Sequence, residues 1–361
     1  MTRKAGIIGA GGVAGLGLLG MHDPDKIGTE PVDASHAGGY AAADGVELVA
    51  IADIDPEKCD TFGELWDIQS DNRFTDHNSM LDTCDLDFVS VCTPTYLHHQ
   101  HVIDAAQSAA NPSVIWCEKP VASSLSDAEH MIDVCDETST ELVINHPSRF
   151  TPSMQQLEAT LLEEDLLGDV RAVTGQFRME LVRNSTHLID TIISLTDLDP
   201  VSVAGHMSSD REIDESLDTA AGSDDSGGGG FLIMENGAFV TIDCTLPRNL
   251  STMAYDFFGT KGRLSIEIPT GEWRYWKVSD SGHTEQTLDI DLAPDDYATG
   301  FANAAEHLVA LADGSADNIS SGREGLRSLE AIIGIYVSHQ TGAKLSLPLD
   351  DPLRKVSIRS W

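Results

Sequence analysis

The sequence predicts an α/β protein with two domains. Residues 1–147 are expected to form a doubly wound parallel sheet, and residues 148–361 an α/β domain with a large, mostly antiparallel open sheet. A chain of 361 residues exceeds the usual size of a single hydrophobic core. Short apolar runs alternate with helical patterns up to about residue 145, which is typical of a parallel sheet covered on both faces. Paired strand-like runs separated by turn residues follow, and these indicate hairpins.

The first domain is predicted from five short apolar runs, which are typical of strands buried on both faces of a parallel sheet. The strands are expected at 5–9, 47–53, 88–92, 113–117 and 141–145, and the helices at 13–21, 56–65, 94–110 and 126–136. Residues 22–45 are rich in Pro, Gly, Asp and His, and their composition predicts an inserted, solvated loop.

The second domain is predicted from a change of pattern after about residue 150. Residues 170–181 alternate as a strand, and hairpins are expected at 231–245, with Asn236-Gly237 as the turn, and at 257–268. Ser226–Gly230 is predicted to be a flexible turn. Helices are expected at 153–164, 187–195, 301–311 and 323–339.

The net charge of this chain is its compositional outlier. Fifty-nine acidic against 22 basic residues give a formal charge of −37, and such a field repels nucleic acid and anionic membrane surfaces. The acids are spread through every segment, which favours a haloarchaeal protein from a salt-rich cytoplasm, where salt screens their repulsion. The alternative is an acidic protein from an ordinary cytoplasm.

The six cysteines show neither a C-x-x-C pair nor metal-ligand spacing, which argues against a disulfide-stapled secreted protein. The apolar run at 1–21 is interrupted by glycines and lacks a signal-peptide cleavage site. No other run is long enough to span a bilayer. We therefore expect a cytoplasmic protein.

The segment Gly9-x-Gly11-x-x-Ala14 follows the first strand, which is the context that a dinucleotide-binding fingerprint requires. Gly9 permits a tight turn, and Gly11 lets a phosphate approach the backbone. Gly12 and Val13 are expected to bind the cofactor with them, at the start of a helix that faces the phosphate. The alternative is a glycine-rich turn with no ligand.

Asp53 ends the second strand, where an acid accepts hydrogen bonds from a free ribose 2′-hydroxyl and repels a 2′-phosphate. It lies farther from Gly11 than the fingerprint's usual spacing, and the insertion at 22–45 accounts for the excess. Glu30 is nearer in sequence but falls in a loop. We therefore predict that Asp53 and the adjacent Ile54 bind the adenosine end of NAD, in preference to NADP. Otherwise Asp53 is an ordinary cap of the next turn.

Thr93, Pro94 and His98 follow the third strand, at the edge where open α/β sheets bind ligands, and they are predicted to contact the cofactor. A proline turn with a capping threonine is the structural alternative. His98 and His101 also suggest a metal site, but no carboxylate or cysteine completes a ligand set, so no metal is expected.

Glu118-Lys119-Pro120 follows the fourth strand, on the same edge as the glycine loop. A partly desolvated lysine there is a usable proton donor or acceptor, and Glu118 and Pro120 are expected to hold it. By itself the tripeptide also fits a surface lysine before a turn. The nearby cofactor loop favours a catalytic Lys119.

Four further polar residues are candidates for the site. His187 opens a predicted helix, and Asp190 lies on the same helix face at i+3, where it orients the ring or is simply structural. An imidazole near Lys119 could exchange a hydroxyl proton with substrate. Asn145 ends the fifth strand and Arg149 follows it, where they line the cleft between the domains or anchor the hinge. Asn145 and Glu118 are also predicted to bind the cofactor.

Taken together, these motifs resemble the Gfo/Idh/MocA oxidoreductases, named for glucose–fructose oxidoreductase and inositol dehydrogenase. The resemblance covers nearly the whole chain and rests on Gly9-Ala10-Gly11, Ala52-Asp53, Thr93-Pro94 with His98, Glu118-Lys119-Pro120, His187-Leu188-Ile189-Asp190 and Phe258-Gly259-Thr260-Lys261-Gly262. It implies a Rossmann domain, an open sheet that forms homodimers or homotetramers, and a cis peptide before Pro120. Lys119 would contact cofactor and substrate hydroxyl, and His187 matches the catalytic histidine.

The chain departs from the family pattern at one position. Many members carry an aspartate four residues before the histidine, whereas this chain has Arg183, and Asn184 takes part of that polar role. The departure suggests a substrate other than an inositol-type polyol, and an arginine favours a carboxylated sugar. Substrate contacts are therefore predicted for Lys119, Arg149, Arg183, Asn184 and His187.

The expected activity is NAD(P)-dependent hydride transfer at a secondary alcohol of a sugar, polyol or sugar acid. A catalytically silent dinucleotide-binding sensor of the same fold is the alternative, because Arg183 replaces the usual acid. His36 and Tyr40, in the segment 22–45, could reach cofactor or substrate, although a solvated loop is the simpler expectation.

Overall fold

The computed structural model describes residues 2–17, 28, 30–208, 225–247, 252–268, 272–288, 290 and 297–358. The chain forms two compact units. The first comprises Met1–Ala122, Asp127–Thr151 and Asp296–Arg323, and the second Ser123–Ser126, Pro152–Asp295 and Glu324–Trp361. The sequence boundary at 147 lies close to the division at Thr151, but the segment Asp296–Arg323 returns to the first unit.

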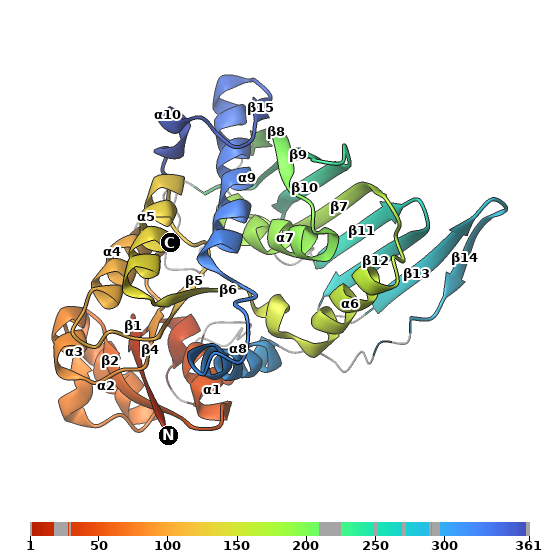
Figure 1. The fold of residues 1–361 in the computed structure, drawn as a ribbon. Helices are drawn as coiled ribbons and strands as arrows, with labels where there is room; N and C mark the ends of the chain where they lie inside the picture. Colours follow the sequence, from red (N-terminus) through yellow and green to blue (C-terminus); the bar gives the residue numbers. More distant parts are fainter. Residues whose placement is uncertain are drawn as a thin grey trace. The chain divides into compact units, whose positions relative to one another are not determined.

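The first unit contains a six-stranded parallel sheet in the order β3-β2-β1-β4-β5-β6 (Figure 1). Its strands are β1 (Arg3–Ile8), β2 (Val46–Ala52), β3 (Arg73–Phe74), β4 (Phe88–Val91), β5 (Val114–Glu118) and β6 (Glu141–Asn145). The doubly wound sheet predicted from the sequence is confirmed, and only the short β3 was missed. The strand order reverses between β1 and β4, the point at which such sheets bind ligands.

The helices of this unit follow the predicted alternation, with one correction at residues 13–17. They are α1 (His36–Ala42), α2 (Pro56–Leu65), α3 (His77–Thr83), α4 (Thr95–Ala106), α5 (Leu125–Thr138) and α8 (Tyr297–Ala312). Asp55 caps α2 and Pro56 occupies its first turn, where proline is favoured. The helix predicted at 13–21 is wrong, because η1 (Gly12–Leu16) is a single π-type turn that Gly17 ends in the left-handed region. Residues 18–21 lie outside the described residues.

The second unit contains a nine-stranded sheet in the order β14-β13-β12-β11-β7-β10-β9-β8-β15. Its strands are β7 (Val170–Arg178), β8 (Pro200–Met207), β9 (Gly228–Met234), β10 (Phe239–Leu246), β11 (Met253–Gly259), β12 (Gly262–Ile268), β13 (Glu272–Ser279), β14 (Gly282–Gln286) and β15 (Leu345–Ser346). Every pair is antiparallel except β7 with β10. The mostly antiparallel sheet and both hairpins are therefore confirmed.

Helices α6 (Pro152–Glu163), α7 (Leu181–Thr196), α9 (Gly322–Thr341) and α10 (Asp351–Arg354) accompany this sheet. Contacts of Gly175 with Ile192 and of Gly334 with Val203 show that α7 and α9 pack on the sheet. The predicted turn at 226–230 is corrected in part, since Gly228 to Gly230 start β9. A Cβ at Gly229 would lie 2.2 Å from the carbonyl oxygen of Ile242, so only glycine lets these strands approach so closely.

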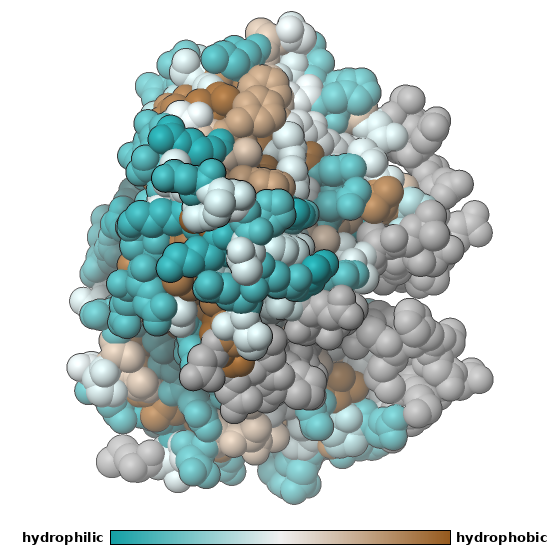
Figure 2. All heavy atoms as spheres, turned by 90° about the vertical axis from the view of Figure 1, so that its right-hand side faces the viewer, coloured by the Kyte–Doolittle hydropathy of each residue, from teal (hydrophilic) through white to brown (hydrophobic). Residues whose placement is uncertain are grey.

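The surface of the molecule is strongly polar. Figure 2 shows a face on which hydrophilic residues dominate and hydrophobic residues are gathered in small patches. Within the described ranges, no helix has the length and apolar character needed to cross a bilayer.

The segment predicted as a solvated loop contains a buried helix instead. Ser35 caps α1 by accepting a hydrogen bond from Gly38 N–H, and His36 and Tyr40 have no exposed surface. Gly39 makes the position possible, because a Cβ there would lie 2.6 Å from the carbonyl oxygen of Phe301 on α8. Helices α1 and α8 are far apart in sequence but lie side by side (Figure 1).

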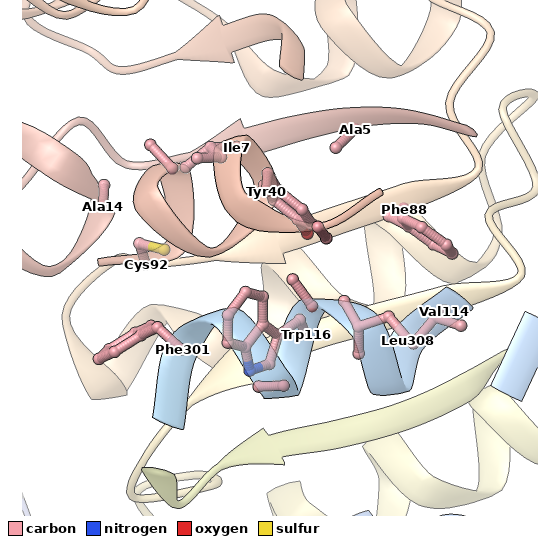
Figure 3. Packing of buried hydrophobic residues seen from close by; sticks show 14 of the residues in the cluster. Ala5, Ile7, Ala14, Tyr40, Phe88, Cys92, Val114, Trp116, Phe301 and Leu308 are labelled. Atoms are coloured by element: carbon pink, nitrogen blue, oxygen red, sulfur yellow. The ribbon is translucent and has the colours of Figure 1, made fainter. Parts of the chain in front are cut away.

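The core of the first unit is an aromatic cluster around Trp116 of β5. Figure 3 shows the indole between Tyr40 on one side and α8, with Phe301 and Leu308, on the other. The Trp116 ring centroid lies 5.6 Å from that of Tyr40 and 5.8 Å from that of Phe301, within the range of favourable aromatic pairs. This packing fixes α1 over the carboxyl half of the sheet.

Candidate active site

The loop after β1 is tightly fixed at Gly9 and open at Gly11. Gly9 has φ of 96°, and a Cβ there would lie 2.9 Å from Cγ2 of Thr93. At Gly11 the nearest atom to an added Cβ is the Cys92 carbonyl oxygen at 4.0 Å. The backbone beside Gly11 and Gly12 therefore has room for a phosphate group, as the fingerprint predicts.

Asp53 links this loop to the end of β2. Its Oδ2 accepts a hydrogen bond from Ala10 N–H at 2.8 Å, and its Oδ1 accepts one from Asp55 N–H at 2.9 Å. The next residue, Ile54, is 93% exposed, although a large apolar side chain normally gains free energy on burial. An anchored carboxylate beside an exposed aliphatic group suits the ribose and adenine of a dinucleotide.

The residues after β4 contact one another and the neighbouring loop at Pro120. The hydroxyl of Thr93 contacts Nδ1 of His101 at 3.0 Å, and Pro94 precedes the first turn of α4. His98 is buried, with Nδ1 2.9 Å from the carbonyl oxygen of Pro120 and Nε2 2.8 Å from that of Thr93. Both ring nitrogens face backbone carbonyls, so His98 joins the two loops, and the cofactor contact predicted for it stays a prediction.

A buried polar cluster lies where β5 and β6 end. Oε1 of Glu118 accepts a hydrogen bond of 2.5 Å from the side-chain amide of Asn145, and Nε2 of His36 lies 3.3 Å from the same oxygen. Burial raises the pKa of Glu118, but the hydrogen bonds from His36 and Asn145 and the charge of Lys119 outweigh it and hold the pKa below its usual value. Glu118 is therefore an anion held by donors.

The Asn145 side chain in this cluster has a hydrogen-bond acceptor without a partner. It is 1% exposed, and its Oδ1 has no hydrogen-bond partner. Since the amide nitrogen donates to Glu118, the oxygen is the atom left to accept from a ligand. A buried, unpaired acceptor is costly, and a bound group with an N–H or O–H would satisfy it.

Lys119 lies directly after β5, beside this cluster. Its backbone N–H donates to Oε2 of Glu118 at 3.2 Å. The cis peptide expected before Pro120 is present, and the Pro120 carbonyl is the one that faces His98. Glu118 and Pro120 thus hold the backbone of Lys119 on both sides, as the sequence predicted.

His187 lies in the second unit, on α7. The sequence predicted that His187 opens this helix, but the helix begins at Leu181. His187 therefore lies in its second turn. Its ring meets Phe177 edge to face with centroids 6.4 Å apart, and its carbonyl accepts a hydrogen bond from the Tyr255 hydroxyl at 3.3 Å. Lys119 belongs to the first unit, so the meeting of these two residues stays a prediction.

The other predicted substrate residues have partners within their own units. The Asn184 amide donates to the Met179 carbonyl, and the Arg183 guanidinium lies 3.4 Å from Glu180. In the first unit, Arg149 donates to the carbonyl of Ile319 at 2.7 Å, which supports the anchoring alternative for that residue.

Asp225 was not predicted from the sequence, and it caps α7 from a distant segment. Its carboxylate oxygens accept hydrogen bonds from the N–H groups of Val182 and Arg183, each at 2.9 Å. Burial raises the pKa of Asp225 to about 7, against the lowering effect of these two bonds. A cap that is 42 residues away along the chain has no local sequence signature.

The first unit fits NAD by three independent features. Gly11 leaves room for phosphate, Asp53 and Ile54 form an acidic and apolar pair for adenosine, and Asn145 offers an unpaired acceptor near Lys119. All of them lie at the carboxyl ends of parallel strands, the edge that binds dinucleotides in this type of sheet.

Comparisons with known proteins agree with this geometry. Residues 3–146 match the family model described as "Oxidoreductase family, NAD-binding Rossmann fold", and residues 160–347 match its "C-terminal alpha/beta domain". The chain is similar to D-apiose dehydrogenase of Paraburkholderia graminis, with 22% identity over 87% of this chain and 86% of that protein. It is 26% identical to D-xylose 1-dehydrogenase [NADP(+)] of Haloarcula marismortui, over 72% and 74%.

Among solved structures, levoglucosan dehydrogenase in complex with NADH superposes with a TM-score of 0.78 at 19% identity. The alignment covers 97% of this chain and all of that one. The two family models together span nearly the whole sequence, and the predicted Rossmann domain and NAD cofactor agree with the first of them. The chain therefore belongs to the Gfo/Idh/MocA family of oxidoreductases.

Proposed function

We propose that this protein is an NAD-dependent dehydrogenase that oxidises a secondary alcohol of a sugar, polyol or sugar acid. The observation that carries the proposal is the grouping of Gly11, Asp53, Asn145 and Lys119 at the carboxyl ends of one parallel sheet. Relatives named for apiose and xylose oxidation support a sugar as the substrate class. The test is a screen of sugars, polyols and sugar acids, followed through the absorbance of NADH.

In this mechanism the nicotinamide, when bound, supplies the hydride acceptor. The ammonium of Lys119 stabilises the negative charge that develops on the substrate oxygen, and Lys119 or His187 takes the hydroxyl proton. Asn145 accepts a hydrogen bond from the bound ligand. Arg183, Asn184 and Arg149 are proposed to influence substrate choice, and an arginine near the substrate favours a carboxylated sugar.

The preference for NAD over NADP rests on Asp53. Its carboxylate is anchored by Ala10 and Asp55, so it would repel a 2′-phosphate placed at the same ribose. The relative from Haloarcula is named for NADP(+), so the screen is run with both cofactors. We expect kcat/KM to be higher with NAD, and a higher value with NADP would remove the ribose role from Asp53.

Gly11→Ala tests the phosphate cradle. The backbone at Gly11 is extended, with φ −91° and ψ −171°, and a methyl group would meet only the Cys92 carbonyl at 4.0 Å. We expect the free energy of unfolding to be nearly unchanged and NADH affinity to fall by about tenfold, because the methyl group fills the space for phosphate. NADH fluorescence and urea unfolding measure the two effects. Unchanged affinity would place the pyrophosphate elsewhere.

A catalytically silent sensor is the second candidate. The observation that favours it is Arg183, which stands where many members carry an acid and is paired with Glu180. In that case the protein would bind NADH and show no turnover with any compound of the screen.

We propose that the fold is adapted to high salt, as expected for a haloarchaeal enzyme, on the basis of the net charge of −37. Thermal unfolding in potassium chloride tests this. We expect Tm to rise by roughly 10 °C between about 0.1 M and about 1 M salt, since the Debye length falls from about 10 Å to about 3 Å. Sucrose at equal osmolarity is the control. A Tm that is independent of salt would contradict adaptation to salt.

We further propose a homodimer or homotetramer formed through the exposed face of the second sheet. Phe239 and Phe258 are 45% and 37% exposed, and both pair in register with Ala172, which lies between them on β7. Phe231 stacks on Phe239 at 5.1 Å. An exposed aromatic patch of this kind is typical of an interaction surface.

Phe239→Asp tests this interface by placing a charge in the patch. We expect the mass measured by light scattering to fall to that of the monomer, because the buried carboxylate would lack a partner. Thr284→Asp, on the exposed β14, is the control. A wild-type monomer would reject the assembly.

A cytoplasmic location is proposed as well, because all six cysteines are free and five of them are buried, as expected in a reducing compartment.

A further inference from the structure

His36 is completely buried at the start of α1, inside the polar cluster under the candidate site. Its Nδ1 lies 2.9 Å from the hydroxyl of Ser90, and its Nε2 lies 3.3 Å from Oε1 of Glu118. The Ser90 hydroxyl in turn lies 2.7 Å from the Tyr40 hydroxyl. Tyr40, Ser90, His36 and Glu118 therefore form one continuous chain of hydrogen bonds.

Chemistry fixes the direction of these bonds. Ionised Glu118 only accepts, so Nε2 of His36 carries the hydrogen and Nδ1 is an acceptor. The amide nitrogen of Asn145 lies 3.4 Å from the same Nε2, so it is a donor to Glu118 and not to the ring. Ser90 then donates to Nδ1 and accepts from the Tyr40 hydroxyl. Burial lowers the pKa of His36 despite Glu118, and burial raises the pKa of Tyr40, which favours the neutral form of both side chains and this direction of the bonds.

The arrangement ends at Asn145. Oε1 of Glu118 receives the hydrogen bonds of both His36 and Asn145, while Oε2 receives the backbone N–H of Lys119. The amide of Asn145 can donate a hydrogen bond to Glu118 only from its nitrogen, which leaves Oδ1 as the atom without a partner. The state of Glu118 therefore decides which way this amide is turned.

The fold holds His36 rigidly. Its ring lies 3.9 Å from the Trp116 ring and 5.6 Å from that of Phe301. Ser35 caps the helix one residue earlier, and Gly39 brings it against α8. A side chain packed on both sides has little rotational freedom, so the direction of its Nε2–H is set by the core.

We propose that His36 is a positioning residue for the cofactor: through Glu118 it orients Asn145 so that Oδ1 accepts a hydrogen bond from the bound dinucleotide. This inference rests on dinucleotide binding from the proposed function, but it does not require turnover. It assigns a role to α1, the helix at 36–42, whose role the family resemblance leaves open.

The test measures NADH affinity by fluorescence, with no substrate present. His36→Leu removes the donor to Glu118, and we expect the Kd for NADH to rise about tenfold, because the charge-assisted bond that orients the cluster is lost. His36→Gln keeps a donor for Glu118 and an acceptor for Ser90, and its Kd should stay within about twofold of wild type. Rescue by glutamine separates positioning from a loss of packing.

A double-mutant cycle with Asn145→Ala identifies the route. If His36 acts through Asn145, the double variant should bind NADH no more weakly than Asn145→Ala alone, whereas independent effects add as free energies. His307→Leu is the matched control, because this half-buried histidine on α8 packs on Phe150 outside the cluster. The Kd of this variant for NADH should equal that of the wild type.

Three results would overturn the proposal: an unchanged Kd in His36→Leu, a glutamine variant as weak as the leucine variant, or additive effects in the cycle. If His36→Leu does not fold, Ser90→Ala takes its place in the cycle with the same expectation, since it removes the donor to Nδ1. Wild-type protein that binds NADH but oxidises no sugar would reject the dehydrogenase and leave this test intact.

Discussion

Replacing Lys119 by alanine is expected to lower kcat by about 1,000-fold, within the range found for positioned proton-transfer groups, while NADH still binds. The Lys119 backbone is held by Glu118 and the turn at Pro120, so truncating the side chain leaves the strand end in place. The measurement compares steady-state turnover of the best substrate with NADH affinity by fluorescence.

Lys119→Arg is the control for charge. It keeps a cation near Glu118 but does not exchange a proton near neutral pH, so its kcat should also fall strongly. Full activity in the arginine variant would show that charge alone suffices. Unchanged kcat in the alanine variant would remove Lys119 from the mechanism.

Gly39→Val is expected to have the largest effect on stability. A Cβ at this position would lie 2.6 Å from the Phe301 carbonyl oxygen and 3.3 Å from the Trp116 ring, so α1 must move away from α8. Overpacking of this kind costs about 3 kcal/mol or more, a large part of the stability of an ordinary domain. Urea unfolding followed by tryptophan fluorescence measures the loss, since Trp116 lies at the contact.

Ala41→Val provides the comparison. Ala41 is exposed on the same helix, so the variant adds a β-branched side chain without a clash and should cost less than about 1 kcal/mol. Equal destabilisation of both variants would mean that helix propensity, and not the contact with α8, limits this segment.

The sequence predicted the fold well where local patterns decide the structure. The run at 56–65 carries a capping aspartate and an N-terminal proline, and α2 has the predicted bounds. The strands of the parallel sheet are continuous apolar runs, which only a buried environment accommodates. The Asn236-Gly237 hairpin was recognisable because its turn needs a residue with positive φ, and Gly237 has φ of 83°.

The remaining elements depend on contacts that no local pattern records. Helix α1 contains Gly38 and Gly39, poor helix formers, and it exists because Phe301 and Trp116 pack around it. Likewise, α8 belongs to the first unit through contacts with residues more than 250 positions earlier. The run at 22–45 therefore resembled a loop.

In the candidate site, too, local patterns were predictable and long-range contacts were not. Gly11, Asp53 and Lys119 were predicted as site residues because strand ends mark the binding edge of a parallel sheet, and the structure does place them at strand ends. Glu118 was predicted to hold Lys119, but its bond to His36 was not predicted, since it joins residues 82 positions apart. The contacts of the His98 ring with the carbonyls of Thr93 and Pro120 were not predicted either, because sequence spacing does not reveal them.

The return of α8 to the first unit has a consequence for biosynthesis. During translation, α8 can cover its side of the Trp116 cluster only after the segment that ends near Arg323 has been made. A recombinant fragment that stops at residue 151 would expose this aromatic surface to water. The first unit therefore depends on residues 296–323 to cover this part of its core.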